Sequence, residues 1–375
     1  MEAEEKVSSF NLRHAFTTDS CSRLSNHPLV LRIFANILGT LRFLSCRNLL
    51  GGPEDAHIEP SMKNTSPILT LLFCLTFVSG VAAQVGGTWQ TLAPMPTARQ
   101  ELATAALNGK IYAIGGYDSS GTKTNIVEVY DPTTNTWTSA HPIPVALHHN
   151  CAAVAAGKLY SFGGPSTQTF VYDELNDSWS AVASMLFFQV LSPAVGVFND
   201  KIYVAGGANG GVGNVMQNQV EVYDPVANTW TALEPMKVGR NHCGGAFIDG
   251  KFYVVGGRRV TRALDANEVY DPQTNTWADQ APLPTPRAGI GVAAVNGEVF
   301  VFGGETLNPS GGGEVHGEVE VFNPATNTWQ SLSPMPTPRH GIFASVIGNN
   351  IFLPGGGIVS GIGPTNVNDV FIVSP

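Results

Sequence analysis

Four arginines occupy equivalent positions in a chain that repeats itself. Each of them, Arg99, Arg240, Arg287 and Arg339, stands 17 residues before the second glycine of a Gly-Gly pair. A guanidinium group offers five hydrogen-bond donors and matches carboxylates well, so four of them on one face predict a site for an acidic or polar ligand. The same donors can instead hold neighbouring loops through backbone carbonyls. Both roles stay open from the sequence.

Histidines lie beside these positions. The second and third repeats have apolar residues, Leu147 and Val190, where the arginine would stand, and His148 and His149 follow the first of them. His242 and His340 fall near the arginines of two other repeats. Imidazoles that converge could bind a transition metal, whereas imidazoles on different repeats could lie too far apart. We expect no metal and no other cofactor.

Two loops could add to such a site. The segment that follows the fifth Gly-Gly pair, residues 305–321, carries Glu305 and glycines that permit movement, and the corresponding loop of the fourth repeat is rich in arginine. An acidic loop beside a basic one could clasp a polar ligand such as a sugar. Alternatively, both are ordinary solvated loops.

The scaffold that must position these side chains is a set of six repeats. Tryptophan occurs only at positions 89, 137, 179, 230, 277 and 329, and apolar runs end in Gly-Gly pairs with the same period of 42–52 residues. Each unit contains four short strand-like runs separated by turn residues such as Asn108-Gly109 and Asp131-Pro132. A period near 50 with strand-type units predicts an all-β propeller rather than a helical solenoid.

The loops after the Gly-Gly pairs and the starts of the first strands should share one face, because consecutive strands run antiparallel. Function concentrates in variable loops on a rigid scaffold, so this loop face is the predicted recognition surface. A single four-stranded sheet cannot bury both of its faces, and each unit therefore needs neighbours. The expected units are residues 97–141, 142–185, 186–236, 237–284, 285–336, and 337–375 together with 84–95.

A ten-residue motif identifies the family. "EVYDPTTNTW" at residues 128–137 recurs with small changes, each copy following an apolar strand that ends in Gly-Gly. This pattern resembles Kelch repeats, and the resemblance covers roughly residues 86–375. It implies a six-bladed Kelch β-propeller with four antiparallel strands per blade, whose last blade is closed by the N-terminal strand around Trp89. In Kelch substrate adaptors of ubiquitin ligases, matching arginines grip acidic peptides.

The superfamily that the chain resembles also contains secreted enzymes. Galactose oxidase needs copper held by an adjacent Tyr-His pair, and this sequence has no Tyr-His dipeptide, so copper is not expected. The resemblance to N-acetylneuraminate epimerase would make Glu101, Glu305 and the arginines candidates. We favour a non-catalytic module that recognises a protein or a carbohydrate through its Arg- and His-bearing loops, with a carbohydrate-active enzyme, an oxidase or an epimerase, as the alternative.

The first part of the chain predicts export. Residues 62–83 have the parts of a signal peptide: Lys63, the apolar run 68–78 and a small-residue cleavage site before Gln84. We therefore expect translation to begin at Met62, residues 1–61 to be non-native or disordered, and the protein to be secreted or periplasmic. Membrane attachment is expected only if residues 66–83 persist as an uncleaved anchor.

Charge and cysteine content narrow the partners. The formal net charge of −9 falls after residue 83, where 13 Lys and Arg stand against 22 Asp and Glu. An acidic domain without a basic run excludes a nucleic-acid partner on electrostatic grounds. Of the cysteines, Cys151 and Cys243 follow the cleavage site, and we expect buried thiols rather than a disulfide. We expect a monomer.

Overall fold

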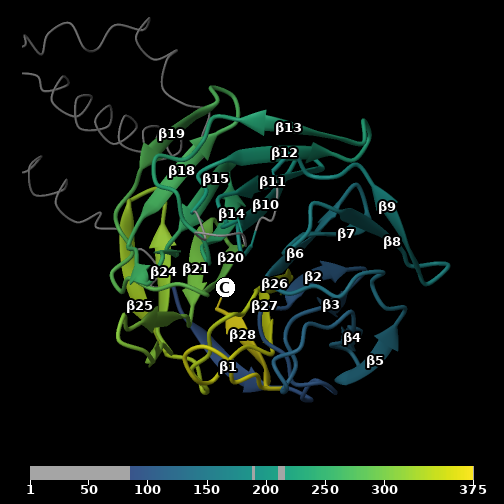
Figure 1. Cartoon of the computed structure of the whole chain (residues 1–375). Coiled ribbons are helices and arrows are strands. Elements are labelled where there is room, and N and C mark those ends of the chain that lie inside the picture. Colours follow the sequence, from purple (N-terminus) through teal and green to yellow (C-terminus); the bar gives the residue numbers. More distant parts are fainter. Residues whose placement is uncertain (1–84, 188–190, 210–215, 375) are drawn as a thin grey trace, which may run out of the picture. The chain divides into compact units, whose positions relative to one another are not determined.

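The protein folds as a six-bladed β-propeller, as the repeats predict. In the computed structural model, which describes residues 85–187, 191–209 and 216–374, six four-stranded antiparallel sheets surround a central axis (Figure 1). The innermost strand of each sheet lies at the axis and the outermost strand at the rim. Residues 1–61 and 62–83 and the position of Val190 lie outside the described residues.

The blades follow one another along the chain. Blade 1 contains β2 (Ala103–Leu107), β3 (Lys110–Ile114), β4 (Val127–Asp131) and β5 (Thr136–Ala140). Blade 2 contains β6 (Asn150–Ala155), β7 (Lys158–Gly163), β8 (Thr169–Asp173) and β9 (Ser178–Val182). Blade 3 contains β10 (Ala194–Phe198), β11 (Lys201–Ala205), β12 (Val220–Asp224) and β13 (Thr229–Leu233).

The second half of the ring repeats this order. Blade 4 contains β14 (Gly244–Ile248), β15 (Lys251–Val255), β18 (Asn267–Asp271) and β19 (Thr276–Asp279). Blade 5 contains β20 (Gly291–Val295), β21 (Glu298–Phe302), β24 (Val319–Asn323) and β25 (Thr328–Leu332). Blade 6 contains β26 (Ser345–Ile347), β27 (Asn350–Pro354), β28 (Asn368–Val373) and β1 (Gly87–Thr91). Short hairpins on the loop face are β16 (Arg258–Arg259) with β17 (Arg262–Ala263), and β22 (Glu305–Leu307) with β23 (Gly313–Val315).

The N-terminal strand closes the ring, as the position of Trp89 predicts. Strand β1 pairs antiparallel with β28, with Trp89 opposite Phe371 (Figure 1). The indole ring packs on Phe371 and Phe302, with ring centroids 5.0 and 5.8 Å away. Blade 6 is thus assembled from both ends of the described chain, which leaves no open edge between the first and last blades.

The repeated ten-residue motif latches each of blades 1 to 5 onto the preceding blade. In blade 1, the Tyr130 hydroxyl donates to Asn135 Oδ1 at 2.7 Å, and this oxygen also accepts the backbone N–H of Ala93 at 2.8 Å. The Trp137 indole N–H donates to the carbonyl of Ala93 at 2.9 Å. Ala93 follows the outer strand of blade 6, so the tyrosine, asparagine and tryptophan of one motif grip the neighbouring blade.

The tryptophan latch recurs in every blade. The remaining indole N–H groups donate to carbonyls at 2.8–3.1 Å in the pairs Trp89–Ser333, Trp179–His141, Trp230–Ala183, Trp277–Glu234 and Trp329–Ala281. The circuit at the rim is therefore complete. One such hydrogen bond contributes only about 1 kcal/mol, but none can form unless two blades are already side by side.

The Gly-Gly pairs allow the backbone of adjacent blades to meet. Gly115 and Gly116 have φ of +67° and +93°. A Cβ at Gly116 would lie 2.7 Å from the carbonyl oxygen of Gln100, a contact that no side chain tolerates. The N–H of Gly116 donates to the carbonyl of Leu147 in the next blade at 2.9 Å. The glycines are therefore required for close approach, in agreement with the sequence.

The four arginines lie inside their blades. Their side chains are 0% exposed. Arg99 donates to the backbone carbonyl of Gly115 at 2.7 Å and pairs with Glu128 at 2.8 Å. The other three repeat this arrangement in the pairs Arg240–Glu268, Arg287–Glu320 and Arg339–Asp369. Each guanidinium thus ties the Gly-Gly strand to the third strand of its own blade, which is the loop-holding role considered above.

Blades 2 and 3 lack this arginine, and they differ in whether the acidic partner is retained. In blade 2, Leu147 stands in the arginine position and buried Phe170 replaces the acid, so both charges are absent together. In blade 3, Glu221 remains although Val190 stands in the arginine position. Glu221 is buried and accepts the N–H of Leu186 at 2.9 Å. Burial raises the pKa of Glu221 to about 7.

Two further findings concern the cysteines and membrane spans. Cys151 and Cys243 are free, buried thiols, as predicted. Among the described residues there is no helix long and apolar enough to cross a membrane.

Deleting residues 84–95 should destabilise the whole propeller. The deletion removes β1, the Trp89 latch and the Ala93 anchor of Trp137. We expect a single thermal transition with a Tm lower by about 10 °C or more, because each kcal/mol shifts a domain of this size by about 2–4 °C. A chain that lacks only residues 1–61 is the control. An unchanged Tm after the longer deletion would disprove the closure.

Replacing Arg240 by leucine should destabilise the fold by about 3–5 kcal/mol, because Glu268 would be left as a buried, unpaired charge. Urea unfolding measures this free energy. The double variant Arg240→Leu, Glu268→Phe reproduces the apolar pair of blade 2 and should recover at least half of the loss. If the single variant is as stable as the native chain, the buried ion pair has no structural role.

Glu221 should make stability depend on pH. Because its pKa rises from the ordinary 4.5 to about 7 in the fold, the native state binds the extra proton between these values. The stabilisation that this bound proton gives to the native state is fully present below pH 4.5 and is lost as the pH rises through 7. When the pH is raised from 5 to 8, we expect the free energy of unfolding of Glu221→Gln to increase relative to that of the native chain by an amount of order 3 kcal/mol. An equal stability difference at both pH values would refute this.

Candidate functional site at the channel mouth

Six residues, one from each blade, form a backbone ring around the axis. They stand two positions after the arginine position, at Glu101, His149, Ser192, His242, Gly289 and Gly341. Each N–H donates to the carbonyl of the preceding member at 2.7–3.0 Å, and Glu101 closes the circuit by donating to Gly341. All six have positive φ, between 44° and 68°. This axial ring sits where the loop face meets the channel.

The backbone of the axial ring favours glycine, yet four members carry side chains. In blades 5 and 6 the position is Gly289 or Gly341, which adopt positive φ without strain. A glutamate or histidine in the same conformation costs about 1 kcal/mol. Strained residues of this kind cluster at functional sites. Glu101, His149 and His242 therefore mark the mouth as the candidate site.

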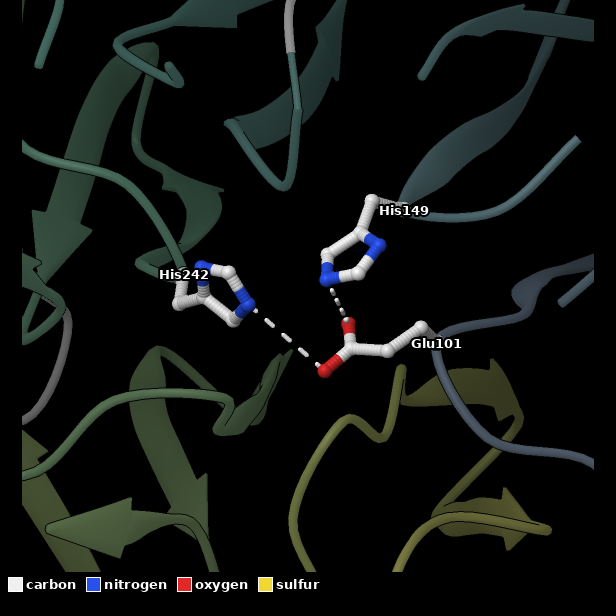
Figure 2. A group of neighbouring side chains, drawn as sticks. All are labelled: Glu101, His149 and His242. Carbon is white, nitrogen blue, oxygen red and sulfur yellow. Dashed lines mark ion pairs between the residues drawn. The ribbon is translucent and has the colours of Figure 1, made fainter. Parts of the chain in front are cut away.

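The side chains of these three residues point toward one another (Figure 2). Nε2 of His149 lies 3.5 Å from Oε2 of Glu101, and Nε2 of His242 lies 3.6 Å from Oε1. The Ser192 hydroxyl donates to Oε2 of Glu101 at 3.4 Å. Blades 2, 3 and 4 thus each contribute one polar group to the single carboxylate of blade 1.

Burial sets the protonation of this group. Desolvation lowers the pKa of His149 to about 4 and also lowers the pKa of His242. For Glu101, desolvation opposes ionisation, but the three neighbouring imidazoles outweigh it and hold its pKa below the usual range. The group therefore holds its buried carboxylate in the ionised form. Among the described residues, neither lysine nor arginine lies within ion-pair distance of Glu101.

A second network lies beside the first. Glu305 pairs with Arg258 at 2.6 Å and with Nδ1 of His340 at 3.5 Å. The Arg258 guanidinium also donates to Nε2 of His242 at 3.0 Å, which joins the two networks. Glu305 and His340 are buried, whereas Arg258 is 15% exposed.

His148 and Tyr117 form the outer edge of the site. Their rings stack with centroids 4.3 Å apart. Nδ1 of His148 lies 2.6 Å from Nδ1 of His149, so His148 orients the ring that faces Glu101. Desolvation lowers the pKa of His148 to about 4. Both His148 and Tyr117 are half-buried and accessible from the loop face.

The structure therefore brings together the predicted His148, His149, His242, His340 and Glu305, along with Glu101. Histidines from blades 2 and 4, which are not neighbours, meet because the axial ring is narrow: the rings of His149 and His242 are 4.9 Å apart. The candidate arginines Arg99, Arg240, Arg287 and Arg339 are not part of this group.

Sequence reasoning missed Ser192 and the joining role of Arg258. A signal was present in the sequence. The fixed distance from the Gly-Gly pairs that aligns the arginines also aligns the residues of the axial ring, which stand two positions later in each repeat. Glycine at that position in two blades indicates positive φ, and polar side chains in the other four are then unusual. Below the ring, the channel is a cavity of about 410 Å³ lined mainly by small apolar residues of the inner strands, together with the hydroxyls of Thr104 and Ser345.

The whole architecture matches known Kelch proteins. The model of the KLHDC2/KLHL20/DRC7 Kelch-repeats domain matches residues 72–237 and 189–356. Kelch-like protein terF of Aspergillus terreus is 32% identical over 76% of this chain and 56% of its own length. Human Kelch-like protein 30 is 43% identical over 45% of this chain and 28% of its own length. The chain thus spans about half, or less, of these relatives.

A solved structure agrees with the fold. The protein described in "Structure of YjhT" superposes with a TM-score of 0.66 over 76% of this chain and 99% of that one, at 16% identity. Such a distant likeness supports the propeller architecture alone. Together with the family match and the repeated motif, it leads to one conclusion: this chain belongs to the Kelch-repeat β-propeller family.

Proposed function

We propose that this protein is a non-catalytic recognition module whose loop face binds a protein ligand. The observation that carries the proposal is a loop of blade 6, residues 357–364, which connects β27 to β28 over the channel mouth. This mouth loop exposes aliphatic side chains while its backbone is tied to the polar networks beneath it.

The exposed aliphatic side chains gather on this face. Ile358, Val359 and Ile362 are 49%, 50% and 54% exposed, and Val260 at the tip of the β16–β17 hairpin is 69% exposed. Large apolar side chains that cluster at the surface mark interaction sites, whereas isolated ones need no explanation. The exposed Leu175 and Val226 lie in single turns on the opposite face.

Several hydrogen bonds hold the mouth loop in place. The side chain of Gln100 donates to the carbonyl of Gly361 and accepts the N–H of Gly363, both at 2.7 Å. His340 donates to the carbonyl of Val359 at 2.9 Å, and Glu305 accepts the N–H of Gly361 at 3.2 Å. A loop that is already ordered loses less entropy on binding. The buried polar groups thus support a preorganised apolar surface.

Charge suggests the character of the ligand. The hairpin of blade 4 exposes Arg259 and Arg262, which lie opposite each other across the two strands. Lys123 on the loop of blade 1 is also exposed. Apolar surface bordered by arginine is typical of the energetically important part of protein interfaces. The proposed ligand is a protein segment with apolar residues next to acidic ones.

A carbohydrate ligand is the second candidate. The stacked pair of Tyr117 and His148 leaves aromatic surface beside polar groups, an arrangement that suits a sugar. Catalysis on a sugar would need Glu101 or Glu305 to reach the substrate, but both carboxylates are buried under 6% exposure. Buried carboxylates favour binding over turnover as the role of this face.

A matched pair of variants tests the proposal. A photo-crosslinking residue at Ile362 in the full chain should capture a protein from an extract of the source cells, whereas the same residue at Leu175 should not. With the captured protein purified, Ile358→Asp together with Ile362→Asp should weaken its binding at least about 10-fold, and Leu175→Asp should leave it unchanged. All variants should keep the native Tm, because these positions are exposed.

Two results would count against a protein ligand. One is equal capture through Ile362 and Leu175. The other is a carbohydrate, found on a glycan array, whose binding or turnover survives the double aspartate variant but is lost on Tyr117→Ala.

A further inference from the structure

We propose that Glu101, His149 and His242 form a binding site for one divalent transition-metal ion at the axial ring. The site lies beneath the loop face and does not depend on the proposed protein ligand. It departs from the expectation of no cofactor, because the sequence does not reveal that residues from blades 1, 2 and 4 meet.

The geometry of the three groups suits a metal ion. The ligand atoms all lie within 4.8 Å of one another, and the two imidazole–carboxylate distances are 3.5 and 3.6 Å. Two ligands bound to one tetrahedral ion at about 2.0–2.1 Å are about 3.4 Å apart. The two distances involve different oxygens of the Glu101 carboxylate, and the most separated ligand atoms, up to 4.8 Å apart, must close by up to about 1.4 Å to bind one such ion. Two imidazoles with one carboxylate form a set that binds zinc or ferrous iron with open positions.

The electrostatics of the mouth leave a negative charge to compensate. The buried carboxylates are Glu101 and Glu305, and the permanent cation beside them is Arg258, which pairs with Glu305. The partners of Glu101 within ion-pair distance are the imidazoles of His149 and His242, and among the described residues neither lysine nor arginine lies that close to it. Isolating an ionised carboxylate from water is costly unless a cation accompanies it. A divalent ion bound by these imidazoles would supply that cation.

A second layer of contacts supports the ligands. Nδ1 of His149 faces Nδ1 of His148 at 2.6 Å, which leaves Nε2 directed at Glu101. Metal-binding histidines are commonly oriented through their other ring nitrogen in this way.

One neighbour competes for the site. Nη2 of Arg258 donates to Nε2 of His242 at 3.0 Å. A metal ion on this nitrogen requires Nη2 to withdraw, while the bond between Nη1 and Glu305 is retained. His149 is 16% exposed and opens the site to solvent from the loop face.

The backbone provides a matched set of variants. Because Gly289 and Gly341 occupy the equivalent positions in blades 5 and 6, His149→Gly and His242→Gly relieve backbone strain and should not unfold the propeller. His141→Ala, which removes an exposed histidine outside the site, is the control. Glu101→Gln tests the charge at nearly constant volume.

The experiment titrates metal alone into the full chain, without a polyhistidine tag and after chelator treatment. We expect one Co²⁺ or Zn²⁺ per chain, with a visible Co²⁺ absorption band that Zn²⁺ displaces. His149→Gly, His242→Gly and Glu101→Gln should each weaken affinity at least about 100-fold, whereas His141→Ala should not. A native chain with no saturable Co²⁺ band, or a band that persists in the glycine variants, would overturn the proposal.

Discussion

Closure of the axial ring is the constraint on which the structure depends. Six backbone N–H groups donate around a closed circuit, so no blade satisfies its innermost donor or acceptor without both neighbours. Since buried backbone groups must be paired, the ring couples the blades into one cooperative unit. The tryptophan latches at the rim form a second closed circuit, and strand β1 is needed to complete it because it carries Trp89.

The buried arginines likewise depend on a partner, since each of them is paired with an acidic residue of its own blade. Where a blade keeps its arginine it keeps the opposing acid, and blade 2 replaces both with Leu147 and Phe170. Blade 3 breaks the rule, and the raised pKa of Glu221 is the physical consequence. The buried charges at these positions therefore stabilise the blade itself. In the sequence alone, the recurrence of arginine was equally compatible with a ligand site.

The geometry of the axial ring brings the polar side chains together at the channel mouth. Positive φ at each ring position aims the side chain toward the axis, where six blades are closest together. Glutamate and histidine occupy this position at a cost that glycine avoids, and the groups that they bring together have little access to solvent. The mouth loop is held by the neighbouring side chains of Gln100, Glu305 and His340, so the proposed recognition surface lies beside the proposed metal site.

The sequence by itself determined the all-β class, the number of blades, the roles of the glycine pairs and the closure around Trp89. These features repeat, and a repeated spacing can be recognised in the sequence without a structure. Only the tertiary structure decided that Arg99 and its equivalents turn into the blade while Glu101, His149 and His242 turn to the axis. A shift of two residues along one segment changes the direction of the side chain and its partners while both residues stay buried, as Arg99 and Glu101 show. The distance between blades 2 and 4 depends on the radius of a ring that no local pattern encodes.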